Sequence, residues 1–89
     1  MKYSVLVTRR ATKQIMKIRQ NDRPRILAGI DNLKNSETWG DVRKLVNHRY
    51  DYRLRIGTYR VLFNATEDRS VEVNEVAVEE VKKRDERTY

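Results

Sequence analysis

The chain has 89 residues, with 20 Lys and Arg against 13 Asp and Glu, which gives a formal net charge of +7. This length supports one modest core and predicts a single domain over residues 1–89. The basic charge predicts a polyanionic partner, either nucleic acid or an acidic protein. Cysteine is absent and histidine occurs once, which excludes disulfides and argues against a zinc site. The N-terminal apolar stretch is too short for a signal peptide or membrane span, so we expect a cytoplasmic protein without a membrane partner.

The first 20 residues predict a strand followed by a helix. Residues 2–8 alternate and are apolar on both sides, so we expect a strand inside the sheet, covered on both faces. Residues 9–19 place apolar side chains at helical spacing, and Thr8 is the expected cap of this helix.

A second helix is expected next, antiparallel to the first because the connection is short. Asp22 is its expected N-cap, and Pro24 lies in its first turn. Trp39 follows in a segment with loop composition, where we expect it to pack against a helix.

The clearest signal is residues 50–64, with the sequence YDYRLRIGTYRVLFN, which predicts an antiparallel hairpin. A two-residue Gly57-Thr58 turn sets its register. The expected pairs are Ile56 with Tyr59, Arg55 with Arg60, Leu54 with Val61, Arg53 with Leu62 and Tyr52 with Phe63.

Because side chains alternate along a strand, this hairpin has an apolar face and a basic face. Arg55 opposite Arg60, with Arg53 diagonal to both, costs about 0.2–1 kcal/mol per like-charged pair. We therefore expect an open, concave basic surface that an anion visits. The apolar wall collects Tyr50, Tyr52, Leu54, Ile56, Tyr59, Val61, Phe63 and Ala65. The other face collects Asp51, Arg53, Arg55, Arg60, Leu62 and Asn64.

The remaining residues predict one more strand and a charged tail. A turn at residues 67–70 precedes a valine-rich strand, with a β-bulge expected near Asn74 and Glu75. Residues 79–89 are dense in both charges and are expected to form a tail beside the arginines. The predicted fold class is α+β: an N-terminal strand, a two-helix hairpin and a three-stranded antiparallel meander, with both helices on one sheet face and a basic C-terminal tail.

The basic face suits phosphate chemistry. Guanidinium groups bind a phosphodiester through two-point contacts, so Arg53, Arg55 and Arg60 can bind RNA or stabilise a phosphorane-like transition state. His48 is the general-base candidate by residue type, or else an incidental loop histidine. The sequence has no Ser-His-Asp arrangement, Gly-rich phosphate loop or metal-ligand spacing, so we expect metal-free chemistry without a cofactor. Further RNA or rRNA contacts, or ordinary surface charges, are Arg43, Lys44, Lys82, Lys83 and Arg87.

The order of elements and three local patterns resemble the RelE toxins of the RelE/ParE toxin superfamily. The patterns are Lys44-Leu45, the hairpin YRLRIGTYRVLF and the closing KKRDERTY. The resemblance spans essentially the whole chain and implies a RelE-like microbial RNase fold. It also implies a ribonuclease toxin that cuts mRNA in the ribosomal A site. In that family the 2'-OH of the RNA attacks without a metal, giving a 2',3'-cyclic phosphate and a 5'-OH.

The resemblance assigns catalytic roles to individual residues. Arg53 and Arg55 match the two basic strand positions, and Arg60 matches the arginine that steadies the scissile phosphate. Arg84 matches the tail arginine near the leaving oxygen, while Tyr89 matches the tyrosine that stacks on the mRNA base. The spacing from Arg84 to Tyr89 is one residue shorter than in the family pattern.

The family pattern has lysines where this chain has Arg53 and Arg55, and arginine essentially cannot accept a proton. Two sources of the general base remain open. The arginines act electrostatically on a 2'-OH that loses its proton to solvent or ribosomal RNA, or else His48 or Tyr89 accepts it.

Two other functions stay open beside the nuclease. A ParE-like toxin resembles this fold but inhibits DNA gyrase, and a nucleic-acid-binding module uses the arginines only as phosphate contacts. For a toxin, the expected partners are the 70S ribosome with its mRNA and a cognate antitoxin with an acidic, partly disordered segment. Operator DNA is an expected partner only through the antitoxin complex.

Overall fold

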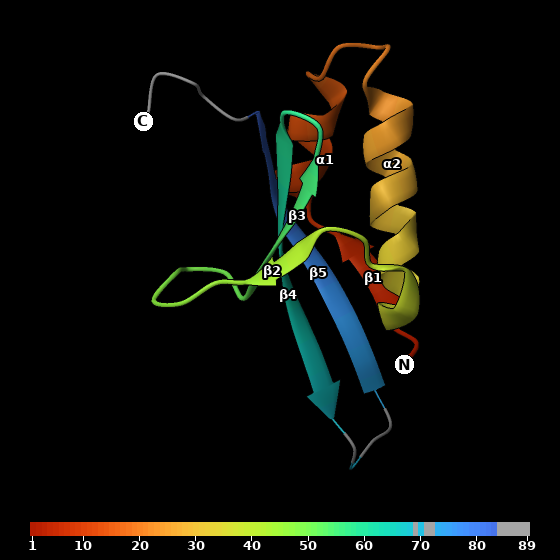
Figure 1. Ribbon diagram of the computed structural model, residues 1–89, viewed down its shortest axis with the longest axis vertical. Helices are drawn as coiled ribbons and strands as arrows, with labels where there is room; N and C mark the ends of the chain where they lie inside the picture. Colours follow the sequence, from red (N-terminus) through yellow and green to blue (C-terminus); the bar gives the residue numbers. More distant parts are fainter. Residues whose placement is uncertain (69, 71–72, 84–89) are drawn as a thin grey trace.

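The computed structural model describes residues 1–68, 70 and 73–83. Within these residues, two α-helices lie on one side of a five-stranded sheet (Figure 1), which confirms the α+β prediction. None of the described helices is long and apolar enough to cross a membrane. The elements are β1 Ser4–Val7, α1 Arg9–Met16, α2 Arg23–Asp31, the 3-10 helices η1 Asn32–Lys34 and η2 Ser36–Thr38, β2 Val42–Lys44, β3 Tyr52–Ile56, β4 Tyr59–Asp68 and β5 Val73–Lys83.

The strand order is β1-β5-β4-β3-β2, with β1 parallel to β5 and the other neighbours antiparallel. The predicted position of the first strand inside the sheet is therefore wrong, because β1 lies at the sheet edge and Leu6 is 54% exposed. The opposite edge strand, β2, was not predicted. Its three residues are too few to show an alternating pattern.

Both helices begin where the sequence predicts. The Thr8 side chain accepts a hydrogen bond from the Ala11 backbone N–H at 3.1 Å and so caps α1. Asp22 occupies the N-cap position of α2, but its side chain makes no capping bond. Its carboxylate instead accepts a hydrogen bond from the Tyr59 hydroxyl at 2.9 Å, which ties the start of α2 to β4.

The predicted hairpin register is confirmed at all five pairs from Tyr52–Phe63 to Ile56–Tyr59. Gly57 has a φ of +57°, in the left-handed region that favours glycine, and this allows the two-residue turn. The apolar wall packs against the helices as expected, with Leu54, Val61 and Phe63 all buried.

Trp39 occupies the middle of an aromatic cluster and has the structural role that we expected. Its ring centroid lies 5.4 Å from Tyr3, 5.5 Å from Tyr52 and 5.3 Å from Phe63. The indole N–H donates to the Leu33 carbonyl at 2.9 Å. The cluster joins Tyr3, the residue before β1, and the strands β3 and β4 to the segment after α2.

The β-bulge lies elsewhere than predicted. The β4–β5 pairing continues without a shift at Asn74 and Glu75, and the irregularity falls between Leu62 and Phe63, which face Glu80 and Val78. Glu79 is therefore the extra residue. Residues 79–83 belong to β5 and not to a tail, which corrects the predicted boundary; residues 84–89 lie outside the described residues.

The bulge decides which side chains of β5 face the helices. An extra residue reverses the alternation, so Val81 joins the core after Val76 and Val78. The same reversal turns Glu80 and Lys82 to the opposite face of the sheet.

Replacing Phe63 by Ala should lower the free energy of unfolding by about 3–5 kcal/mol, because this fully buried ring leaves a cavity. Urea denaturation followed by the fluorescence of Trp39 measures the loss. Leu27→Ala is the control: this side chain is 51% exposed, and its removal should cost less than about 0.5 kcal/mol. Equal losses in the two variants would contradict the proposed core.

Candidate nucleic-acid interface

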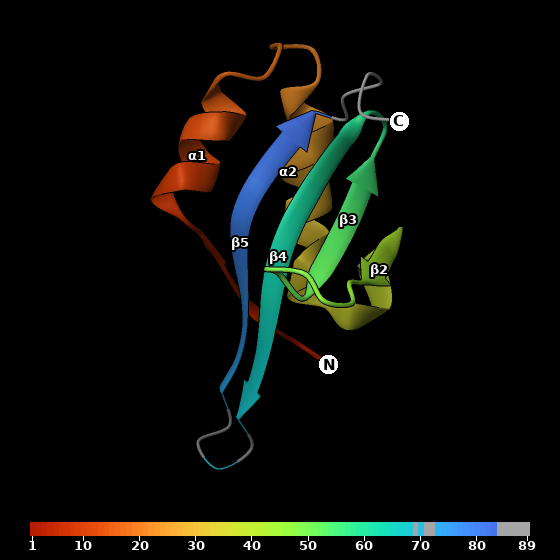
Figure 2. The ribbon, with the colours of Figure 1, turned by 90° about the vertical axis from the view of Figure 1, so that its left-hand side faces the viewer.

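The face of the sheet opposite the helices carries two adjacent rows of paired residues that together contain five cationic side chains. Figure 2 views the sheet from this side. Directly paired residues in a sheet have Cβ atoms about 4.5–5.5 Å apart, so neighbouring side chains within each row lie close together. The first row contains Arg55, Arg60 and Lys82, on β3, β4 and β5. The second row contains Arg43, Arg53, Leu62 and Glu80, on β2, β3, β4 and β5. We call the surface formed by Arg43, Arg53, Arg55, Arg60 and Lys82 the basic face.

The structure brings together some of the predicted site residues and separates others. Arg43 pairs with Arg53 and joins the basic face, whereas Lys44 pairs with Tyr52 and lies on the helix side. Lys82 pairs with Arg60 on the basic face. Lys83 pairs with Tyr59 on the helix side, so the predicted RNA contacts at Lys44 and Lys83 are not part of this surface. Arg84, Arg87 and Tyr89 lie outside the described residues.

The charges on the basic face interact with one another. Arg53 is half-buried, and burial is the main cause that lowers its pKa. Arg55, Arg43 and Arg60 lower it further, while the carboxylate of Asp41 opposes them. Arginine remains charged despite such shifts, so the face is a permanent cluster of positive charge.

The basic face is less open than expected, because two residues of its second row, Leu62 and Glu80, are buried. Leu62 is buried, although the sequence places it among the arginines. Tyr50 was predicted on the apolar wall, but it is not part of the core cluster on the helix side. Burial and the nearby carboxylate of Glu80 raise the pKa of its hydroxyl, which places this side chain on the side of the basic face. Tyr50 precedes β3, so the alternation of side chains along that strand does not determine the side on which its ring lies.

Glu80 was missed by the sequence analysis and is the one charged residue among the described residues that is buried, at 3% exposed. In the sequence, Val78 and Val81 are three residues apart, whereas core residues of a regular strand are two apart. This break in the alternation is the signal that could have shown that Glu80 faces away from the helices. Burial by itself would raise the pKa of Glu80. Hydrogen bonds from Tyr50 and Gln14 and the charges of Lys82 and Arg10 outweigh burial, so the pKa lies below its ordinary value and the carboxylate stays ionised.

His48 lies in the exposed loop that precedes β3, as predicted. Its Nδ1 accepts a hydrogen bond from the backbone N–H of Tyr50 at 3.1 Å, which leaves Nε2 as the ring atom that can face a substrate. Among the described residues, no group of three His, Cys, Asp or Glu side chains is placed to hold a metal ion.

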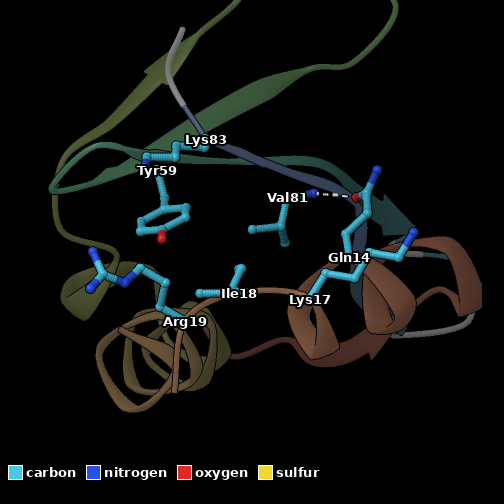
Figure 3. A pocket seen from close by; sticks show the side chains of 7 residues that line it. All are labelled: Gln14, Lys17, Ile18, Arg19, Tyr59, Val81 and Lys83. Carbon is cyan, nitrogen blue, oxygen red and sulfur yellow. Dashed lines mark hydrogen bonds between the residues drawn. The ribbon is translucent and has the colours of Figure 1, made fainter. Parts of the chain in front are cut away.

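A pocket of about 370 Å3 lies on the helix side of the sheet, between α1 and the ends of β4 and β5 (Figure 3). Ile18, Val81 and the ring of Tyr59 supply apolar surface, while three cations add positive charge. Gln14 closes one side, where its Oε1 accepts a hydrogen bond from the Val81 backbone N–H at 2.7 Å. The lining residues are Gln14, Lys17, Ile18, Arg19, Tyr59, Val81 and Lys83.

Solved structures of similar fold come from antitoxin–toxin complexes. One is a chain of the RelB-RelE antitoxin-toxin complex from Methanococcus jannaschii, with 21% identity, a TM-score of 0.66 and 88% of each chain covered. Another is from the archaeal RelE-RelB complex of Pyrococcus horikoshii OT3, with 25% identity and a TM-score of 0.66, over 97% of this chain and 99% of that one. A third, from the RelBE2 complex of Mycobacterium tuberculosis, has 24% identity and a TM-score of 0.57, over 94% of this chain and all of that one.

The chain therefore has the RelE toxin fold, and the family resemblance predicted from the sequence is confirmed at the level of structure. No protein-family model and no curated protein matches the sequence.

Replacing Arg55 by Gln should stabilise the protein by about 0.2–1 kcal/mol, because the substitution removes a like charge directly opposite Arg60. The gain should shrink as salt screens the repulsion. Thermal unfolding at low and high ionic strength measures it. Arg9→Gln, at an exposed position of α1, makes the same charge change away from the basic face. The prediction fails if Arg9→Gln stabilises the protein as much as Arg55→Gln does.

Proposed function

We propose that the protein is the toxin of a type II toxin–antitoxin system, a ribosome-dependent endoribonuclease that cuts mRNA in the ribosomal A site and inhibits translation in the cytoplasm. The observation that carries this proposal is the placement of Arg53, Arg55 and Arg60 on adjacent rows of one sheet face. Their mutual repulsion is a cost that a bound phosphodiester would relieve. The RelE fold of the chain supports the same function.

The reaction that fits this site transfers the scissile phosphate to the neighbouring 2'-oxygen. The 2'-OH loses its proton and attacks phosphorus, the bond from phosphorus to the 5'-oxygen breaks, and the 5'-oxygen takes up a proton. Negative charge builds on the phosphoryl oxygens, where Arg60, flanked by Arg53 and Arg55, lowers the energy of the transition state. Arg84 and Tyr89 complete the proposed catalytic set, at the leaving oxygen and the mRNA base.

The described arginines act as electrostatic groups and not as bases in this reaction, since guanidinium does not give up its proton. His48 is the described residue with an imidazole ring, but its Nδ1 accepts the Tyr50 N–H, so Nε2 carries the proton of the neutral ring and acts as a donor. His48 can accept the 2'-OH proton only through Nδ1, once that hydrogen bond is released. Solvent or ribosomal RNA can accept the same proton. A His48→Gln variant distinguishes these routes by the presence or absence of a change in the pH–rate profile.

We also propose a cognate antitoxin with an acidic, partly disordered segment. The pocket beside α1 combines apolar surface with Lys17, Arg19 and Lys83, which suits an apolar anchor flanked by carboxylates. Such a segment would neutralise part of the positive charge of the toxin. Operator DNA would be bound only through the resulting complex.

Arg60→Ala should lower the rate of mRNA cleavage by about 100-fold or more, because it removes charge stabilisation of the transition state. Primer extension on a defined mRNA, with and without programmed 70S ribosomes, measures the cuts. The free energy of unfolding should stay within about 1 kcal/mol of the wild type, since the side chain lies outside the core. Lys17→Ala, at the end of α1, is the control and should cut normally.

The outcomes of this assay separate the rival functions. Cuts within A-site codons that need the ribosome and disappear in Arg60→Ala support the nuclease. Salt-sensitive RNA binding without any product would identify a nucleic-acid-binding module. Intact mRNA together with inhibition of gyrase supercoiling would identify a ParE-like toxin.

Adding the product of the neighbouring gene should suppress cleavage if that product is the antitoxin. Arg19→Glu should weaken the complex about tenfold or more, by placing a like charge at the acidic partner, and should leave cleavage unchanged. Isothermal titration at two salt concentrations measures the affinity. Lys2→Glu is the matched control, on an exposed residue away from the pocket. Undiminished cleavage after the addition would contradict this partner.

A further inference from the structure

Glu80 is a carboxylate buried within a strongly basic surface. It lies on β5 opposite Leu62 and in the same row as Arg53, which belongs to the proposed phosphate site. A buried charge is costly unless its partners are placed well around it. The contacts of Glu80 therefore indicate what this residue holds in place.

Two cations contact the same oxygen of Glu80. Arg10 Nη2 lies 3.2 Å from Oε1, and Lys82 Nζ lies 3.5 Å from it. Both cationic side chains are more than half exposed, whereas the carboxylate is almost fully covered. Glu80 thus contacts the two cations from the buried side, and their exposed sides remain open to a ligand.

Two neutral side chains complete the shell around the carboxylate. Tyr50 and Gln14 both lie close enough to the carboxylate to lower the pKa of Glu80. Because Oε1 of Gln14 already accepts from the backbone N–H of Val81, its amide nitrogen is the group left to donate. Glu80 therefore joins β5 to α1 and lies close to the loop that contains Tyr50.

That loop, residues 45–51, lies on the basic side of the sheet and crosses in front of β4 in Figure 2. The Leu45 N–H donates to the Asp51 carbonyl at 2.8 Å and closes the loop, and the Asp51 N–H donates to Asn64 Oδ1 at 2.8 Å. Tyr50 is the one buried residue of the loop, and its contact with Glu80 reaches β5. The exposed side chains of His48 and Arg49 both lie near the ring of Tyr50, at 5.9 Å between the ring centroids and 5.8 Å from the guanidinium carbon to the ring centroid.

We propose, on the basis of the nuclease function above, that Glu80 is a positioning residue of the RNA site, which fixes Arg10, Lys82 and loop 45–51 around the proposed catalytic arginines. Arg10 thus extends the phosphate-binding surface from the hairpin to α1. Positive groups held in one geometry stabilise a transition state better than mobile ones, since they need no reorganisation during the reaction.

The positioning role and a simple charge role predict opposite results. Glu80→Gln removes a negative charge from a basic surface, so charge alone would strengthen RNA binding and increase cleavage at low substrate concentration. If Glu80 positions the site, the same variant frees Arg10, Lys82 and the loop, and the rate of the chemical step falls even though RNA binds as well as before or better.

The test compares Glu80→Gln with Glu75→Gln, which makes the same charge change at an exposed position of β5. Cleavage on programmed ribosomes is measured over a range of substrate concentrations. We expect kcat to fall by about tenfold or more in Glu80→Gln, as for a displaced catalytic group, with KM unchanged or lower. Glu75→Gln should keep both values. An unchanged or higher kcat in Glu80→Gln would overturn the proposal.

Amide hydrogen exchange in residues 45–51 gives a readout that does not depend on catalysis. Exchange should be faster in Glu80→Gln and in Tyr50→Phe, which removes only the hydroxyl and serves if Glu80→Gln fails to fold. Unchanged exchange in both variants would show that Glu80 does not hold the loop. A wild-type protein that leaves mRNA intact would overturn the nuclease function and the catalytic role of Glu80, while loop exchange would still report on the contact itself.

Discussion

The site depends on the β3–β4 hairpin and the alternation of its side chains. The turn at Gly57 fixes the register, and the register places the aromatic and aliphatic side chains on one face and Arg53, Arg55 and Arg60 on the other. A shift of one residue would bury the arginines and expose Phe63. Burial of the apolar face therefore keeps the arginines at the surface, and the stability of the core and the geometry of the site have a single cause.

The basic face combines repulsion with structural support. Arg55 and Arg60 face each other across two strands, a pairing of like charges that generally costs about 0.2–1 kcal/mol. The same closeness would allow a phosphate to make several contacts at once. Stability given up at a functional site is recovered elsewhere in the fold. Here the aromatic cluster around Trp39 joins β3 and β4, which carry the arginines, and the ionised carboxylate of Glu80 ties Arg10 of α1 to the neighbouring strand β5.

The two faces of the sheet are suited to two different partners. The basic face presents arginines to a phosphate backbone, whereas the pocket beside α1 presents apolar surface with cations around it. Lys82 and Lys83 are neighbours in sequence but lie on opposite faces of β5. Lys82 pairs with Arg60 on the basic face, and Lys83 pairs with Tyr59 on the helix side. In the proposed toxin, RNA and antitoxin would therefore contact different sides of the same strand.

The sequence by itself determined the hairpin, its five pairs, the helix starts and the RelE resemblance, because a two-residue turn, caps and alternation act over short distances. Only the tertiary structure decided that β1 is an edge strand, that β2 extends the sheet and that Glu79 forms the bulge. These features depend on which distant segments become neighbours. The environment of Glu80 has the same origin: its partners come from α1, a loop and β5, and one inserted residue turned its side chain toward the arginines.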